Sequence, residues 1–261
     1  MIDMKEFFVG EHLGHCGDNI CCLSAAIEFA EKIDGVVYVN FFKDVVEAYD
    51  HPRLKFGTRG VELHVMAADK HRNKHPGLFV NILGTYYSEF GLPIVDPELR
   101  LPDFVKCSSK VLLQPNSNYA YNPPAKYVQD IVNEFVRETG KTVYAIGNLK
   151  TPRVYENVDY SLLRDDVPFM MRQVQNAICV LTPRSFSANL AAGYHIPAFM
   201  WSPEDGEDWH LNYKGWRGEK VNFGKMADET LPRLRNFIKD FGLGKTFDKQ
   251  DDVNKTEEGK Q

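Results

Sequence analysis

Residues 10–18 read Gly10-Glu11-His12-Leu13-Gly14-His15-Cys16-Gly17-Asp18, a glycine-rich stretch typical of a turn. Before it, residues 6–9 are apolar and aromatic and predict a buried strand. After it, apolar residues recur every three or four positions over 19–33 and predict a helix. Glycine lets such a turn approach another group closely, and the free N–H groups of the first helical turn attract anions. Asp18 therefore either caps the helix or takes part in a ligand site.

The composition is that of a soluble globular protein. The chain has 261 residues, of which 43% are hydrophobic and 26% charged, with a net charge of −5. This charge gives no general basis for nucleic-acid binding. No apolar stretch is long enough to span a bilayer and the first residues do not resemble a signal peptide, so we expect a cytoplasmic protein, with attachment at the membrane periphery as the alternative. The five cysteines show no paired spacing and predict reduced thiols.

The rest of the chain alternates between predicted strands and helices. Strands are predicted at 36–40, 61–65, 110–114, 142–147, 178–182 and 197–201, and helices at 44–49, 78–87, 123–139, 167–175, 185–193 and 229–241. A proline-bearing connector lies between about 91 and 109. Such alternation predicts parallel sheets, and we expect two α/β domains at 1–105 and 106–244, followed by a charged, disordered tail at 245–261.

Polar turns follow several of the predicted strands. Open parallel sheets bind ligands beyond the carboxyl ends of their strands. Two α/β domains therefore predict a ligand cleft between them. The candidate walls of this cleft are Gly14–Asp18, Asn116–Asn118, Gly147–Asn148 and Thr182–Asn189.

Four segments, in this order, resemble those of one enzyme family. They are Gly14-His15-Cys16-Gly17-Asp18, Tyr86-Tyr87-Ser88-Glu89-Phe90-Gly91-Leu92 followed by Pro97-Glu98-Leu99, Val111-Leu112-Leu113-Gln114-Pro115-Asn116-Ser117, and the run 182–197 from Thr182 to Pro197. Together they resemble glycosyltransferase family 9, the heptosyltransferase-like enzymes. The resemblance covers about residues 6–203. It implies the GT-B fold, in which two facing Rossmann-like domains enclose a ligand cleft, and it implies that helix 229–241 packs back across the junction between them.

The chain departs from that family at three positions. The family's Asp-Thr-Gly near the C-terminal site is Arg184-Ser185-Phe186 here, and its histidine is Asn189. The family's phosphate-neutralising lysine has no clear counterpart near Tyr121 and Asn122. Three alternatives to a glycosyltransferase acting on a glycan or glycolipid stay open: a nucleotide-sugar-binding homologue without activity, a sugar-nucleotide epimerase or hydrolase, and a glycosyltransferase acting on DNA bases.

The resemblance implies a metal-independent glycosyltransferase that uses a nucleotide-diphosphate sugar as donor and a hydroxyl acceptor such as a glycan or glycolipid. Such a reaction needs a base for the acceptor hydroxyl and positive charge for the leaving diphosphate. By resemblance Asp18 is the base, next to the close-approach glycines Gly14 and Gly17. Arg184 is expected to hold the diphosphate together with the start of helix 185–193; the alternative is a surface arginine.

The remaining predicted contacts are polar groups in turns and at a helix start. Ser185 and Ser187 are expected to offer hydroxyl groups to the diphosphate. Asn116, Ser117 and Asn118 are either phosphate contacts or a plain turn, and Gly147 and Asn148 either face the nucleotide base or form a turn. The spacing His12-x-x-His15 is too loose to predict zinc, and we predict no metal site and no cofactor beyond the donor.

Overall fold

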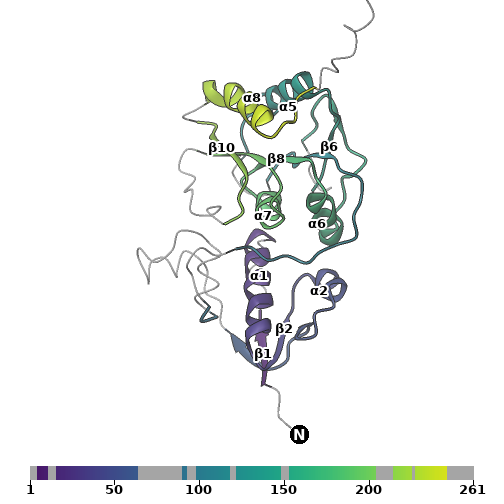
Figure 1. Ribbon diagram of the computed structural model, residues 1–261, viewed down its shortest axis with the longest axis vertical. Coiled ribbons are helices and arrows are strands. Elements are labelled where there is room, and N and C mark those ends of the chain that lie inside the picture. Colours follow the sequence, from purple (N-terminus) through teal and green to yellow (C-terminus); the bar gives the residue numbers. More distant parts are fainter. Residues whose placement is uncertain are drawn as a thin grey trace, which may run out of the picture.

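Two separate parallel sheets organise the molecule (Figure 1). The computed structural model describes residues 5–10, 16–63, 90–92, 98–117, 122–147, 153–203, 214–224 and 227–245, apart from the side chains of Cys16 and Asp18. The parallel strands and their helices confirm the predicted α/β class. The domain boundaries at 105/106 and 244/245 stay predictions, as does the division into two domains.

The first sheet has the strand order β3-β2-β1-β4. Its strands are β1 (Lys5–Val9), β2 (Gly35–Val39), β3 (Leu54–Phe56) and β4 (Val61–Leu63), and its helices are α1 (Cys16–Lys32) and α2 (Lys43–Tyr49). The apolar runs of β1 and β2 pair in register from Lys5 with Gly35 to Val9 with Val39. The predicted helix at 78–87 lies outside the described residues.

The second sheet has the strand order β10-β9-β8-β5-β6-β7. Its strands are β5 (Val111–Leu113), β6 (Val143–Ala145), β7 (Val158–Asp159), β8 (Cys179–Pro183), β9 (Ala198–Ser202) and β10 (Gly218–Asn222). Its helices are α5 (Ala125–Thr139), α6 (Val167–Gln175), α7 (Phe186–Gly193) and α8 (Thr230–Asp240), the last preceded by a 3₁₀ turn at Ala227–Glu229.

Alternate residues of the second sheet enter two different cores, because successive side chains of a strand point to opposite faces. In β5, Leu112 joins a core that extends through α6, α7 and α1 to the first sheet. Its neighbours Val111 and Leu113 join a second core beneath α5 and α8. The core that positions the candidate site is the first one, and it is continuous across both sheets.

The predicted position of the C-terminal helix is wrong. Instead of crossing the junction, α8 packs on α5 and β10, at the end of the molecule farthest from the first sheet (Figure 1). Its Phe237 ring lies 5.7 Å from that of Phe199 in β9, and Thr230 Oγ1 lies 2.7 Å from the hydroxyl of Tyr127 in α5. The apolar face of α8 is thus buried by the sheet and helix of its own half, which leaves no apolar stripe for the junction.

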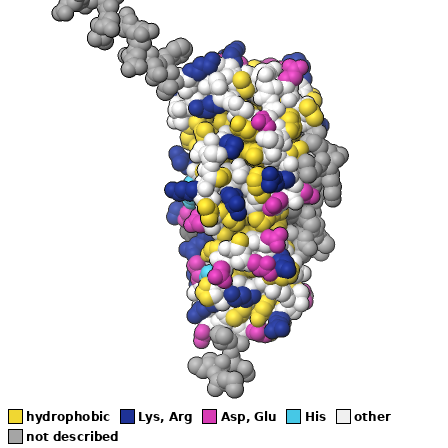
Figure 2. All heavy atoms as spheres, turned by 90° about the vertical axis from the view of Figure 1, so that its right-hand side faces the viewer, with side chains coloured by type: hydrophobic (Ala, Val, Ile, Leu, Met, Phe, Trp, Pro, Cys, Tyr) yellow, Lys and Arg dark blue, Asp and Glu magenta, His cyan; other side chains and the backbone are white. Residues whose placement is uncertain are grey.

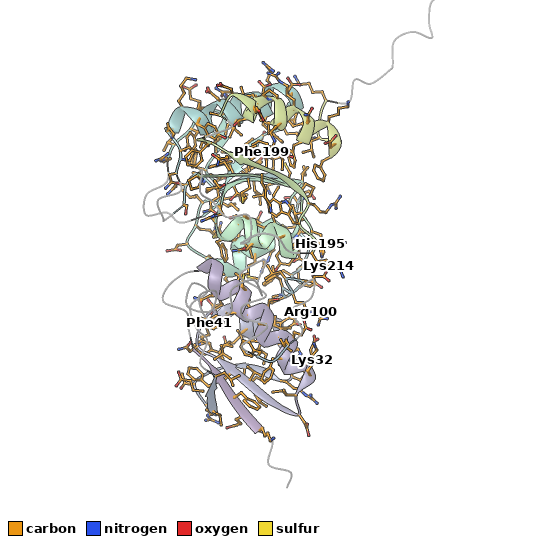
Figure 3. All side chains as sticks on the ribbon, turned by 90° about the vertical axis from the view of Figure 1, so that its left-hand side faces the viewer. Lys32, Phe41, Arg100, His195, Phe199 and Lys214 are labelled. Carbon is orange, nitrogen blue, oxygen red and sulfur yellow. The ribbon has the colours of Figure 1, made fainter. Side chains whose placement is uncertain are left out.

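The connector at 98–104 is bound on both sides. The backbone N–H of Arg100 donates to Ser24 Oγ in α1 at 2.6 Å, and the Arg100 guanidinium pairs with Glu31 and Glu28 of the same helix; Figure 3 shows Arg100 beside α1. From α7, the Tyr194 hydroxyl donates to the carbonyl of Pro102 at 2.8 Å. The connector therefore joins α1 to α7 by side-chain contacts as well as by its backbone.

Two further observations concern the surface. Figure 2 shows basic and acidic side chains interspersed over one face, with neither sign forming a continuous patch there. Among the described residues, none of the helices combines the length and the apolar character that crossing a lipid bilayer requires.

Candidate functional site

The predicted ligand-binding stretches lie where the strand order of each sheet reverses. In open parallel sheets, ligands bind beyond the carboxyl ends of the strands at this switch point. In the first sheet it lies at the end of β1, which runs between β2 and β4 and leads into the 10–18 stretch. In the second sheet it lies between β5 and β8, which lead into residues 114–117 and 184–187.

Two contacts bring these switch points together at the start of α7. A Cβ atom placed on Gly17, the second residue of α1, would lie 2.9 Å from Nδ2 of Asn189 in α7, so only glycine fits without a shift of the asparagine. The ring of Phe42, which follows β2, lies 6.4 Å from that of Phe186, the first residue of α7. The start of α1 and the start of α7 are accordingly neighbours (Figure 1).

Asp18 is the third residue of α1, because the helix begins at Cys16 rather than at the predicted residue 19. The expectation that Asp18 is the N-cap is therefore wrong, although a carboxylate in the first turn is still favoured by the helix dipole. Its side chain and the whole of Gly14 lie outside the described residues. The proposed base role of Asp18 stays a prediction.

Arg184 follows β8 directly, and its backbone N–H donates to the carbonyl of Trp201 in β9 at 2.9 Å. The residue is half-buried, and the Nη1 atom of its guanidinium is buried. This arrangement favours an inward-directed guanidinium over the surface arginine considered as the alternative. It places a fixed positive charge next to the switch point of the second sheet.

The side chain of Gln114, at the end of β5, links three of the predicted stretches. Its Oε1 atom accepts hydrogen bonds from Ser185 Oγ at 2.7 Å and from the backbone N–H of Ser187 at 3.3 Å. Its Nε2 atom donates to the carbonyl of Asn116 at 3.0 Å. Its Cγ atom lies 3.7 Å from where a Cβ on Gly147 would be, a glycine with φ of 120°. Sequence reasoning missed Gln114, because nothing local distinguishes it from the last residue of a strand.

Ser185 and Ser187 differ in their surroundings. Ser185 is half-buried and is the N-cap residue of α7. Ser187 is fully buried, and its Oγ atom has no hydrogen-bond partner among the described residues. The contact from the Ser187 hydroxyl to the diphosphate stays a prediction.

The turn after β5 is held by its neighbours. Asn122 accepts from the Ser117 N–H at 2.7 Å and donates to the Ser117 carbonyl at 2.8 Å, and the Asn116 side chain accepts from the Arg153 N–H at 3.4 Å. The Tyr155 hydroxyl donates to the carbonyl of Pro115 at 3.2 Å, and burial raises the pKa of this phenol. These bonds match the plain-turn alternative for Asn116 and Ser117. Asn118 and Asn148 lie outside the described residues.

Two residues that follow β2, Asn40 and Phe42, were not predicted as site residues. Phe42 has left-handed backbone angles (φ 51°, ψ 45°), which are uncommon for a bulky side chain and often mark functional segments. The Oδ1 atom of Asn40 is buried with no hydrogen-bond partner among the described residues. A strained aromatic residue and an unsatisfied amide oxygen carry no pattern visible in a single sequence.

The described residues bring no three His, Cys, Asp or Glu side chains together in a group that could hold a metal ion. The N-terminal histidines that prompted the question of zinc, His12 and His15, lie outside these residues.

Comparison with known proteins places the fold. No family model matches the sequence, and no curated protein matches it either. Among solved structures, the iron-containing dodecameric glycosyltransferase TibC from enterotoxigenic E. coli H10407 superposes with a TM-score of 0.63 at 15% identity, covering 84% of this chain and 62% of that one. The fold is that of the heptosyltransferase-like glycosyltransferases.

Two other structures support this fold assignment. The glycosyl transferase family 9 protein of Veillonella parvula DSM 2008 superposes with a TM-score of 0.60 at 9% identity, covering 92% of this chain and 97% of that one. E. coli heptosyltransferase WaaC with ADP gives 0.59 at 10% identity, covering 90% and 99%. At these identities the likeness establishes the fold alone, and this chain spans 62% of the length of that TibC chain.

Proposed function

We propose that this chain is a glycosyltransferase that moves a sugar from a nucleotide-diphosphate sugar to a hydroxyl group of an acceptor, a glycan or glycolipid. The observation that carries the proposal is the meeting of both switch points at the start of α7, through the Gly17–Asn189 and Phe42–Phe186 contacts. The ligand-binding edges of the two sheets lie side by side. This arrangement suits a reaction between two substrates, a donor and an acceptor.

The division of roles follows from the residues at each edge. The second sheet offers Arg184, whose guanidinium suits the negative charge that develops on the leaving diphosphate as the sugar–phosphate bond breaks. The first sheet offers Asp18, whose carboxylate would accept the proton of the acceptor hydroxyl as the sugar is transferred. The sugar–phosphate bond breaks, the bond from the sugar to the acceptor oxygen forms, and the diphosphate leaves with the nucleoside.

Support for a nucleotide donor comes from the structural neighbours. The WaaC structure was solved with ADP, and TibC was solved in complex with ADP-D-beta-D-heptose. An adenine nucleotide is therefore the first ligand to test. We further propose that Arg184 supplies the charge that a metal ion provides in other transferases; TibC is described as iron-containing, so this point needs its own test.

The decisive experiment is a thermal-shift panel of nucleoside diphosphates and nucleotide sugars, followed by a transfer assay with the best donor. A ligand present at 100 times its Kd should raise the free energy of unfolding by about 2.7 kcal/mol. Preincubation with EDTA should leave turnover unchanged. Absence of any shift across the panel would reject the proposed function, and activity lost with EDTA and restored by a metal would reject metal independence alone.

A further inference from the structure

The side chain of Gln114 accepts hydrogen bonds from two donors at the start of α7. It is 9% exposed and bridges the switch point of the second sheet, from the end of β5 to the first turn of α7. Its Oε1 atom faces two donors, the Ser185 hydroxyl at 2.7 Å and the Ser187 N–H at 3.3 Å. These are two of the groups that the sequence assigned to the diphosphate.

Two backbone groups fix which way the Gln114 amide points. The Ser187 N–H can only donate and the Asn116 carbonyl can only accept, at 3.3 Å from Oε1 and 3.0 Å from Nε2. Turning the amide over would set an NH₂ group against the N–H and an oxygen against the carbonyl. Oε1 must therefore face Ser185, and the serine must be the donor of that bond.

The single hydroxyl proton of Ser185 is thus used inside the protein. The other acceptor near it, Thr182 Oγ1 at 3.2 Å, is also internal, and the proton of Thr182 goes to the carbonyl of Pro183 at 2.8 Å. While Gln114 Oε1 accepts the Ser185 proton at 2.7 Å, Ser185 can only accept a further hydrogen bond. A phosphate oxygen, which needs a donor, finds none in this hydroxyl.

We propose that Gln114 is a positioning residue that withholds Ser185 and the Ser187 N–H from anions and leaves the diphosphate to Arg184. The inference rests on the proposed function and describes its donor site in more detail. It replaces the expectation that the Ser185 hydroxyl and the start of α7 hold the diphosphate together with Arg184.

The test compares the affinities of ADP and adenosine by calorimetry. The dissociation constant of adenosine divided by that of ADP isolates the contribution of the diphosphate, because any contact to the nucleoside cancels, and this ratio falls when a diphosphate contact is lost. Ser185→Ala should leave this ratio within twofold of the wild-type value, whereas Arg184→Ala should lower it tenfold or more. Gln114→Met removes the shorter of the two acceptors of the Ser185 proton and leaves Thr182 Oγ1 at 3.2 Å, a neutral acceptor that an anionic phosphate oxygen outcompetes. Adding Ser185→Ala in that background should therefore lower the ratio about tenfold, the lower end of the range for a hydrogen bond to a charged group.

Gln173→Met is the matched control, because Gln173 on α6 is buried to a similar extent, at 8% exposed. In that background Ser185→Ala should again leave the ratio unchanged. If Gln114→Met does not fold, the wild-type background still decides: a tenfold loss of the ratio in Ser185→Ala alone overturns the inference. An unchanged Ser185→Ala effect on going from wild type to a folded Gln114→Met protein overturns it as well. A wild-type protein that binds neither ligand overturns the proposed function, and the inference with it.

Discussion

Asp18 follows Gly17, a residue of α1 that lies close to Asn189 of α7. This position makes the role of Asp18 the sharpest test at the scale of single residues. If Asp18 is the base, Asp18→Asn should retain the fold and ADP affinity while turnover falls about 10²–10⁴-fold, the usual contribution of a positioned acid or base. Turnover and urea denaturation measured on the same preparation check this.

The alternative is that the Asp18 carboxylate only stabilises α1 by its favourable interaction with the helix dipole at the first turn. In that case Asp18→Asn should be fully active and should lose about 0.3–1 kcal/mol of stability. Full turnover in a folded Asp18→Asn protein would remove the proposed base.

Arg184 is the second residue-scale test. Arg184→Ala should weaken ADP binding by about 1.5–3 kcal/mol, the scale of hydrogen bonds to a charged group, and adenosine binding much less. Arg172→Ala, an exposed arginine on α6, is the matched loss of one positive charge and should change neither affinity. Equal losses for ADP and adenosine in Arg184→Ala would show that the guanidinium does not contact the diphosphate.

At the scale of elements, the end of α7 is fastened to the connector. The hydroxyl of the half-buried Tyr194 donates to the carbonyl of the buried Pro102 at 2.8 Å, and burial raises the pKa of this phenol. Tyr194→Phe should therefore cost about 1 kcal/mol of unfolding free energy at pH 7. Tyr38→Phe, whose hydroxyl meets the exposed Glu6 at 3.2 Å, should cost less than about 0.5 kcal/mol.

The same bond predicts a pH dependence. Because the pKa of Tyr194 is raised in the folded protein, its phenol stays protonated where that of the unfolded chain begins to ionise, near the ordinary value of 10.0. Its contribution is therefore fully present below about pH 10 and declines as the pH rises further. Unfolding curves at pH 7 and pH 10.5 should show the advantage of wild type over Tyr194→Phe shrinking. An advantage that grows with pH would contradict the buried hydroxyl.

Sequence patterns located most of the elements that bury an apolar face and missed two edge strands that do not. Helix α6 is as predicted, and α5 and α7 differ by one or two residues at their starts, because their apolar residues recur at helical spacing. Strands β3 and β10 lie at sheet edges and each has a single buried residue, Leu54 and Val221, so neither carries an apolar run. The stretches of the candidate site were found as turns, whereas Gln114 was not, because its partners lie 71 and 73 residues away.

At the scale of the whole molecule, one core joins the two sheets. It contains Val9 of β1, Ile20 of α1 and Leu190 of α7 together with Val180 of β8. Ile20→Ala should therefore cost about 2–5 kcal/mol and should speed hydrogen exchange in peptides from both β2 and β8. Mass spectrometry of the exchanged peptides checks this. Faster exchange in β2 alone would mean that the two sheets unfold separately.

The doubly bound connector has a consequence for the integrity of the chain. Contacts to α1 and α7 end near Phe104, whose N–H donates to Gln175 of α6 at 2.8 Å, and the next residue, Val105, is 82% exposed. The chain just after Phe104 therefore takes no part in the contacts that hold the two sheets together. A protease cut there would leave two fragments that stay associated, and the same two fragments made as separate polypeptides should assemble by complementation.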